Sequence, residues 1–244
     1  MTANPIRIAM WSGPRNLSTA MMRSFGARAD TSCVDEPFYA HYLNVTGHIH
    51  PLQEDILDQH ETDPRRVIEQ LTRQACPTPI QYQKHLTHHM IPEIPRDWFG
   101  AVRHAFLIRH PARVLASYAR KMETVSLEAI GLPQQVELFD QVSRSLGRAP
   151  HVLDCDAVLN APQAQLDRLC QALEIPFDPA MLRWSAGPKP EDGAWAPHWY
   201  DAVNASTEFA RPPGSLPKLP DDWETLLRQA LALYAQLFRH TEHI

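Results

Sequence analysis

The sequence lacks several features, and each absence disfavours a class of function. Its four cysteines lie far apart with no CxxC pair, which argues for reduced thiols and against a disulfide framework or a zinc site. No apolar run is long enough to span a membrane, and nothing near the N-terminus resembles a signal peptide. A basic surplus is also missing, because the formal net charge is -5. We therefore expect a cytoplasmic protein that binds neither nucleic acid nor a membrane.

Lysine is scarce as well. Only four of the 23 basic residues are lysines, so arginine carries most of the positive charge. A guanidinium suits bidentate recognition of phosphate or sulfate-like groups, although GC-rich coding gives the same bias. Because 244 residues with a hydrophobic share of 44% suffice for one large core, residues 1–244 are expected to form a single domain.

Short apolar segments that contain β-branched or aromatic residues indicate buried strands at 6–11, 31–34, 79–86, 104–108 and 151–155. Helical patterns alternate with them, including runs expected to be capped by Asn160 and by a capping box at 221–224. This alternation predicts an α/β fold, a three-layer α/β/α arrangement around a central, mostly parallel sheet of about five strands. Residues around 40–75 are expected to form a helical insertion, and residues around 186–220 a long ordered loop.

The first candidate site is the turn Pro14-Arg15-Asn16-Leu17-Ser18-Thr19, between the first strand and a helix-compatible run. Free backbone N–H groups and the positive end of a helix meet at such a junction, which suits a phosphate. Arg15 would add charged donors, and Ser18 and Thr19 would add hydroxyls. The Gly-Lys-Ser/Thr ending of a Walker A motif is absent, which weakens a kinase interpretation. An ordinary helix start capped by Asn16 or Ser18 would explain the same residues.

The second candidate site follows the fourth strand. Arg109 stands at the end of that strand, and Ser117 lies two turns into the next helix. Because α/β sheets bind ligands at the carboxyl ends of their strands, both side chains can reach one anion beside the first phosphate site.

Together the two motifs resemble those of the sulfotransferase family, which transfers a sulfonyl group from 3′-phosphoadenosine 5′-phosphosulfate (PAPS). In that family a P-[KR]-S-G-[ST]-T turn holds the 5′-phosphosulfate, and residues 14–19 match its proline, basic, hydroxyl and threonine positions. The family's R-x-P-x-x-x-x-x-S pattern holds the 3′-phosphate, and Arg109, Pro111 and Ser117 match it. With a similar strand and helix at 151–178, the resemblance covers about residues 6–185. It implies a P-loop NTPase-like fold, PAPS as co-substrate and no metal.

The sequence departs from the family pattern in two places. Leu17 replaces the glycine of the phosphate turn, which predicts either a turn without positive φ there or a shifted backbone. The Arg-Lys-Gly loop near the C-terminus is missing as well. Lys189, His198 or Arg211, all in the proline-rich loop, are candidates to replace it.

Sulfonyl transfer needs a base for the acceptor, cations for the sulfonyl and bridging oxygens, and in-line placement. Arg15 is expected to face the leaving phosphate. Glu36 lies in a segment (35–38) that resembles the E-x-F segment of bacterial carbohydrate sulfotransferases, where a glutamate is the base. His85 lies in a segment (83–89) that resembles the K-T-H segment of the cytosolic enzymes, where a histidine is the base. Glu36 and His85 are both candidates for the base, and His88 is a weaker candidate. Alternatively, Glu36 is a helix-capping or salt-bridged carboxylate, and His85 is a strand histidine bonded to the backbone.

The resemblance thus predicts a PAPS-dependent sulfotransferase acting on a hydroxyl or amine of a small-molecule acceptor. The alternatives are a nucleotide-binding protein without transfer activity, favoured by Leu17, and a P-loop small-molecule kinase. The histidines at 48, 50, 85, 88 and 89 lack a matching carboxylate or cysteine pattern, so no metal is predicted. Trp195, Trp199 and Tyr200 are expected to form a wall over adenine or acceptor, or else to pack on the sheet. A homodimer is left open.

Overall fold

The computed structural model describes residues 4–122, 124–212 and 214–241. At its centre lies a parallel sheet with the strand order β2-β3-β1-β4-β5. Its strands are β1 (Ile6–Ser12), β2 (Thr31–Asp35), β3 (Ile80–Leu86), β4 (Arg103–Ile108) and β5 (His151–Asp154). The predicted three-layer α/β fold with about five strands is confirmed, and all four strand pairings are parallel.

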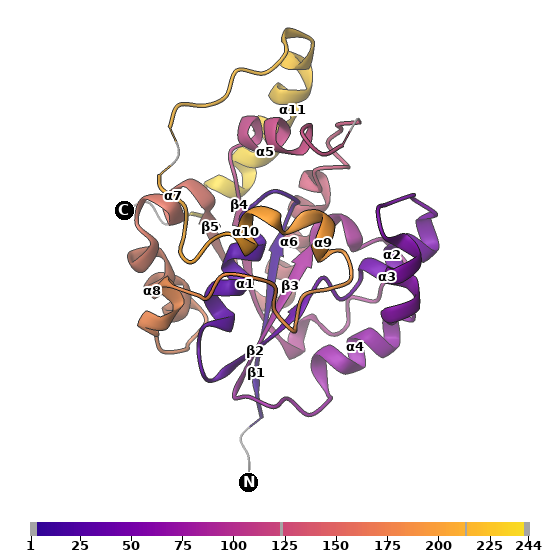
Figure 1. Cartoon of the computed structure of the whole chain (residues 1–244), viewed down its shortest axis with the longest axis vertical. Coiled ribbons are helices and arrows are strands. Elements are labelled where there is room, and N and C mark those ends of the chain that lie inside the picture. The colour runs from indigo at the N-terminus through magenta and orange to yellow at the C-terminus, as the bar shows by residue number, and fades with distance from the viewer. Residues whose placement is uncertain (1–3, 123, 213, 242–244) are drawn as a thin grey trace.

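Helices follow or precede each strand and cover both faces of the sheet (Figure 1). They are α1 (Ser18–Gly26), α2 (Tyr39–Thr46), α3 (Gln53–Gln59), α4 (Pro64–Thr72), α5 (Pro111–Tyr118), α6 (Leu132–Leu146), α7 (Cys155–Asn160), α8 (Pro162–Ala172), α9 (Ala196–Trp199), α10 (Asp201–Asn204) and α11 (Glu224–Phe238). Short 3₁₀ turns lie at 87–89, 99–101, 179–182 and 221–223. Among the described residues, no helix is long and apolar enough to cross a membrane.

Two hydrophobic clusters fill the space between the sheet and its helices. One contains Met10 and Leu107 and the inner sides of α1, α7 and α8. The other contains Trp11 and Phe106 and the inner sides of α4, α5, α6 and α11. Successive residues of a strand point to opposite faces, so neighbours such as Met10 and Trp11 enter different clusters. Both faces are therefore buried, as expected for a parallel sheet.

Two helix caps differ from those predicted. Asn160 is the last residue of α7, and α8 begins after Ala161 without a capping side chain. The run at 221–223 is a 3₁₀ turn, and α11 begins at Glu224, also without a side-chain cap. A carboxylate caps α7 instead, because Asp154 accepts hydrogen bonds from the N–H groups of Asp156 and Ala157.

Two segments interrupt the strand and helix alternation. Helix α2 of the first lies beside α9 of the second near the carboxyl ends of the strands, whereas α4 of the first lies towards the start of β1 (Figure 1). Residues 40–75 contain α2, α3 and α4. Residues 186–220 are largely irregular but include the short helices α9 and α10. Both segments contribute to the cavity described next.

Candidate active site

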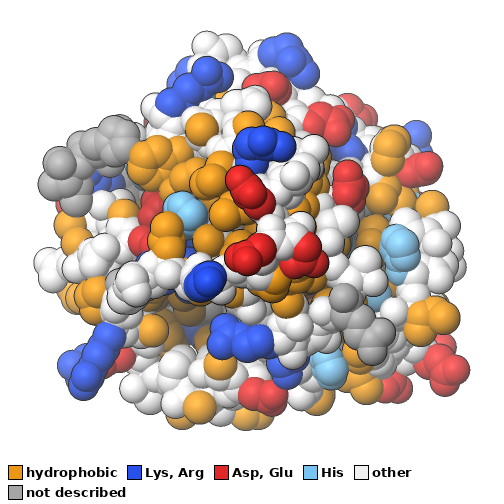
Figure 2. All heavy atoms as spheres, turned by 90° about the horizontal axis from the view of Figure 1, so that it is seen from above, with side chains coloured by type: hydrophobic (Ala, Val, Ile, Leu, Met, Phe, Trp, Pro, Cys, Tyr) orange, Lys and Arg blue, Asp and Glu red, His pale blue; other side chains and the backbone are white. Residues whose placement is uncertain are grey.

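A cavity of about 360 Å³ opens at the carboxyl edge of the sheet. Its floor is formed by the turn after β1 and by the ends of β2, β3 and β4. Helix α5, helix α2 and residues from 199 to 210 form its walls. Figure 2 looks down on this end of the molecule and shows hydrophobic side chains gathered near the middle of the face, bordered by charged ones.

The turn predicted to bind phosphate, residues 14–19, lines this cavity in full. Its backbone is left-handed at Arg15 (φ 64°) and at Leu17 (φ 62°). Of the two alternatives for Leu17, a turn without positive φ is therefore wrong, because the leucine itself adopts the conformation that glycine favours. Leu17 precedes the first residue of α1 and gives no side-chain cap, so the first N–H groups of the helix are not capped by it.

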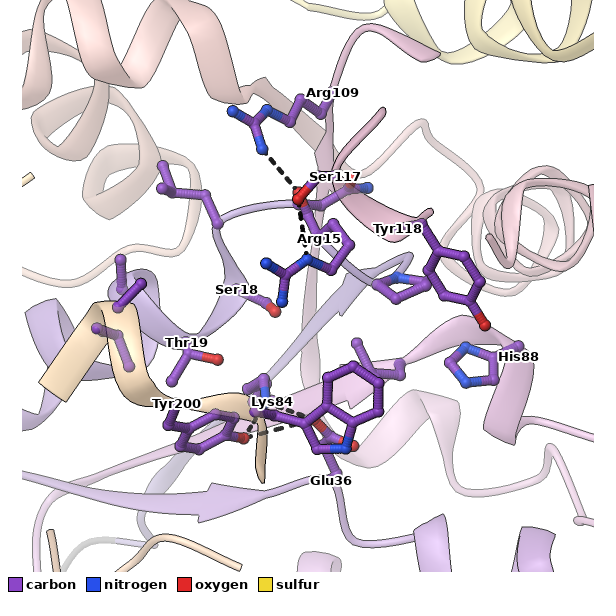
Figure 3. A pocket seen from close by; sticks show the side chains of 18 of the residues that line it. Arg15, Ser18, Thr19, Glu36, Lys84, His88, Arg109, Ser117, Tyr118 and Tyr200 are labelled. Atoms are coloured by element: carbon purple, nitrogen blue, oxygen red, sulfur yellow. Dashed lines mark hydrogen bonds and ion pairs between the residues drawn. The ribbon is translucent and has the colours of Figure 1, made fainter. Parts of the chain in front are cut away.

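Three predicted phosphate-binding residues meet beside this turn (Figure 3). Arg109 donates a hydrogen bond from Nη1 to the backbone oxygen of Arg15, at 3.0 Å. Arg15 donates from Nε to Oγ of Ser117, also at 3.0 Å. Among the described residues, neither arginine forms a salt bridge, and Nε of Arg109 is buried without a hydrogen-bond partner. The two guanidinium groups thus lack a carboxylate to balance their charge.

The electrostatic surroundings of Arg15 also favour an anion at this site. Burial lowers the pKa of its guanidinium, and the positive charges of Arg120 and Arg109 lower it further. A site in which neighbouring cations lower the pKa of Arg15 favours an anion, because an anion would relieve both repulsion and desolvation. The cluster is therefore suited to a phosphate or a phosphosulfate.

Glu36 lies at the other end of the cavity, across from the arginines (Figure 3). It is 6% exposed, follows β2 and has φ 39°, a left-handed conformation. Its Oε1 lies 2.5 Å from Nζ of Lys84, which is buried within β3. Burial raises the pKa of Glu36 to about 7, although Lys84 lowers it and Asp35 raises it. A carboxylate with a pKa near neutrality is suited to accept a proton in catalysis.

His85 does not belong to this site. It is 1% exposed and does not line the cavity, and its ring stacks on Trp11 at 4.4 Å on the opposite face of the sheet. Burial lowers its pKa to about 3. Because strand side chains alternate, Lys84 and His85 must face opposite sides of β3. The structure therefore does not support His85 as the base and brings Lys84, which the sequence did not single out, to Glu36.

Uncharged rings line the remaining wall. His88 and His89 both reach the cavity, and the ring of His89 stacks on Tyr39 at 4.4 Å. Burial lowers the pKa of His88 to about 3 and that of His89 well below its ordinary value. Both histidines are therefore neutral near pH 7, and with Tyr118 and Trp199 they form a chamber of neutral aromatic groups.

The proline-rich segment enters the site in a different way from the prediction. None of Lys189, His198 and Arg211 lines the cavity, and Lys189 instead bonds to Oγ of Ser185. Trp195, expected as a wall residue, is 1% exposed in the core. Trp199 and Tyr200 do line the cavity. Within the described residues, no group of three or more histidine, cysteine, aspartate or glutamate side chains could hold a metal ion.

Comparison with known proteins agrees with this geometry. The family model of the sulfotransferase domain matches residues 6–240. The chain belongs to this family. Two Arabidopsis thaliana proteins, named branched-chain-amino-acid aminotransferase-like protein 1 and protein 2, are each 36% identical to this sulfotransferase-family chain. The matches cover 99% and 97% of the chain but 43% and 42% of the relatives, so the chain spans less than half their length.

Solved sulfotransferase structures share the fold. The sulfotransferase domain of the curacin biosynthetic pathway has a TM-score of 0.56 at 17% identity and covers 99% of both chains. The domain of the Synechococcus PCC 7002 olefin synthase has a TM-score of 0.53 at 16% identity, covering 98% of this chain and 96% of its own. The sulfotransferase from Alicyclobacillus acidocaldarius has a TM-score of 0.58 at 11% identity, covering 99% and 98%. At these identities the similarity shows the sulfotransferase fold.

Proposed function

We propose that this chain is a PAPS-dependent sulfotransferase that moves a sulfonyl group to a hydroxyl or amine of a small-molecule acceptor. The observation that carries the proposal is the pair Arg15 and Arg109, two guanidinium groups without a salt bridge among the described residues, next to the start of α1. The 5′-phosphosulfate fits the turn at 14–19, and the 3′-phosphate fits Arg109 and Ser117. In this arrangement the nucleotide supplies the sulfonyl group and the leaving phosphate.

Each residue then has a defined role. Arg15 stabilises the charge that develops on the 5′-phosphate as its bond to sulfur breaks. Glu36 accepts the proton of the acceptor while the acceptor oxygen or nitrogen bonds to sulfur. The products are a sulfated acceptor and 3′,5′-ADP, and the proton stays on Glu36 until solvent removes it. The neutral rings of Tyr118 and Trp199 favour an uncharged acceptor, since burying a charge against them would be costly.

The reaction is proposed to take place in the cytoplasm, in keeping with four cysteines that are all free thiols. The aminotransferase-like names of the Arabidopsis relatives describe proteins of which more than half lies outside the match, so they assign no role to this cavity. A nucleotide-binding protein without transfer activity is the second candidate. The retained left-handed backbone at Leu17 weakens it, because the turn conformation expected of a glycine is present.

Turnover of labelled PAPS with a panel of uncharged alcohols and amines tests the proposal. We expect Glu36→Gln to lower kcat/KM by about 10²–10⁴-fold, as for loss of a general base, and to leave the affinity for 3′,5′-ADP within about twofold because Glu36 is remote from the arginines. Glu174→Gln is the control, since Glu174 also has a positive φ (50°) but lies outside the cavity.

A wild-type rate in Glu36→Gln would show that Glu36 is not the base. Binding of 3′,5′-ADP together with no turnover of PAPS by any acceptor would favour the non-catalytic alternative.

A further inference from the structure

Lys84 is the most enclosed charged group at the cavity. Its ammonium is 1% exposed and has three N–H bonds to donate. All three are taken, by Oδ1 of Asp35 at 2.8 Å, Oε1 of Glu36 at 2.5 Å and the phenol oxygen of Tyr200 at 2.5 Å. No N–H of Lys84 is left to contact a sulfonyl oxygen, so whatever Lys84 does in the reaction it does through these partners.

The three partners come from different parts of the chain. Asp35 ends β2 and is the register partner of Lys84 in β3. Tyr200 lies on the segment 185–206, which we call the strap. The phenol of Tyr200 donates to Oδ2 of Asp35 at 2.6 Å and accepts from Nε1 of Trp195 at 3.0 Å. The strap thus closes a buried ring of hydrogen bonds that joins Asp35, Lys84 and Tyr200.

Glu36 touches this ring on one side only. Its Oε1 accepts from Lys84, while its Oε2 lies 3.9 Å from Nδ1 of His89, a nitrogen that is buried without a hydrogen-bond partner. An acceptor hydroxyl between these two atoms would satisfy both. One carboxylate oxygen is therefore fixed, and the other faces the place where a proton can be taken.

We propose that Lys84, held in place by Asp35 and Tyr200, is a positioning residue that orients Glu36 for proton transfer and does not itself touch the sulfonyl group. This inference rests on the proposed function, because it takes Glu36 as the base. With Glu36 ionised the set Asp35, Lys84 and Glu36 carries one net negative charge. Once Glu36 has accepted the proton, a neutral Asp35–Lys84 pair remains, which suits a buried site.

The surroundings of Glu36 give this arrangement a distinctive signature. The titratable groups that face it are Asp35, Lys84 of β3, His89 after β3, Tyr39 of α2 and Tyr200 of the strap. Burial raises the pKa of Glu36, and of these groups Lys84 and Tyr200 lower it whereas Asp35 raises it. Removing Tyr200's phenol and removing Asp35's charge should therefore shift the titration of Glu36 in opposite directions.

Infrared difference titration of the whole chain between pH 5 and pH 9 measures this directly, without an acceptor. The protonated carboxyl band that is lost in Glu36→Gln reports Glu36, with an expected midpoint of about 7. In Tyr200→Phe we expect the midpoint to rise by about half a pH unit or more. In Asp35→Asn we expect it to fall by about one unit. Tyr234→Phe is the matched control, because it removes a phenol that bonds a different carboxylate, Asp154.

Opposite shifts in the two variants, with Tyr234→Phe unchanged, support the proposal. If these residues had a merely structural role, both substitutions would admit water and move both midpoints down towards the ordinary glutamate value. That result, or no shift in either variant, would overturn the proposed positioning role. Calorimetry with 3′,5′-ADP on the same proteins distinguishes failure of the positioning role from failure of the proposed function. If opposite shifts occur but no nucleotide binds, only the proposed function fails; if nucleotide binds without them, only the positioning role fails.

Discussion

At the scale of single residues, five non-glycine residues in the described part of the chain have a positive φ, and three of them line the cavity: Arg15, Leu17 and Glu36. A left-handed residue other than glycine costs about 1–2 kcal/mol, and such strain tends to gather at functional sites. At Leu17 the side chain also packs on the core cluster beneath the turn. The packed side chain offers a compensation for the strain at this position.

Leu17→Ile tests this strain. A β-branched side chain is particularly disfavoured at positive φ, so we expect the substitution to lower the free energy of unfolding by about 1–2 kcal/mol more than the same change in a helix. Leu227→Ile in α11 is the matched control, since Leu227 is also half-buried but helical. Urea denaturation of both variants gives the comparison. Equal losses at the two positions would mean that the left-handed turn stores no strain.

Residue-level prediction of the site was uneven for a physical reason. Glu36, Arg15 and Arg109 directly follow strands or lie in the turn after one, where the parallel sheet gathers side chains at one edge. His85 and Lys84 lie within β3, where only one of two neighbours can face the cavity. Residue type favours His85 as a base. Strand alternation, together with the charges of Asp35 and Glu36, favours Lys84 as the residue that faces the cavity.

At the scale of elements, the ends of the five strands agree with the sequence prediction to within one residue. The apolar residues of β1 and β4 are buried on both faces, which makes the signal strong for these two strands. Helix α6 was not predicted, because its buried face includes Gln135 between Leu132 and Leu138. The amide nitrogen of Gln135 is satisfied by a tertiary contact, since it donates to the backbone oxygen of Leu107 at 2.9 Å.

Buried hydrogen bonds join the strap to α1 and to β2. Arg23 of α1 forms a bidentate, buried pair with Asp192 of the strap, at 2.6 Å and 2.7 Å. The neighbouring N–H of Gly193 donates to Oδ2 of Asp35. These contacts join residues 158 or more positions apart, so local sequence patterns could not reveal them. They place Tyr200 beside Lys84.

Asp192→Asn tests how the strap is held. Removing one charge from a buried pair leaves Arg23 uncompensated, so we expect a loss of about 3 kcal/mol in the free energy of unfolding. We also expect faster trypsin cleavage after Arg183, an exposed residue that lies just before the strap. Asp201→Asn is the control on the same strap, because the pair of Asp201 with Lys121 is 3.7 Å long and exposed. If both variants keep wild-type stability and protease resistance, the Arg23–Asp192 pair does not hold the strap.

At the scale of the whole molecule, the strand order places β1 between β3 and β4. The turn after β1 therefore lies between the two halves of the cavity. On the β4 side stand Arg109 and Ser117, and on the β3 side stand Glu36 and Lys84 (Figure 3). Ligands of α/β sheets bind at such a crevice between diverging connections. The topology thus separates an anion-binding half from a proton-accepting half.

We therefore expect the cavity to bind a nucleotide through two phosphates, one at the turn and one at Arg109. Calorimetry with 3′,5′-ADP and 5′-AMP tests it most directly, since the two ligands differ only in the 3′-phosphate. We expect the wild-type chain to bind 3′,5′-ADP at least about tenfold more tightly than 5′-AMP, as for a charge-assisted phosphate contact. Arg109→Ala should remove this advantage and leave 5′-AMP binding unchanged. Equal affinity of the wild-type chain for the two nucleotides, or no binding of either at millimolar concentration, would contradict it.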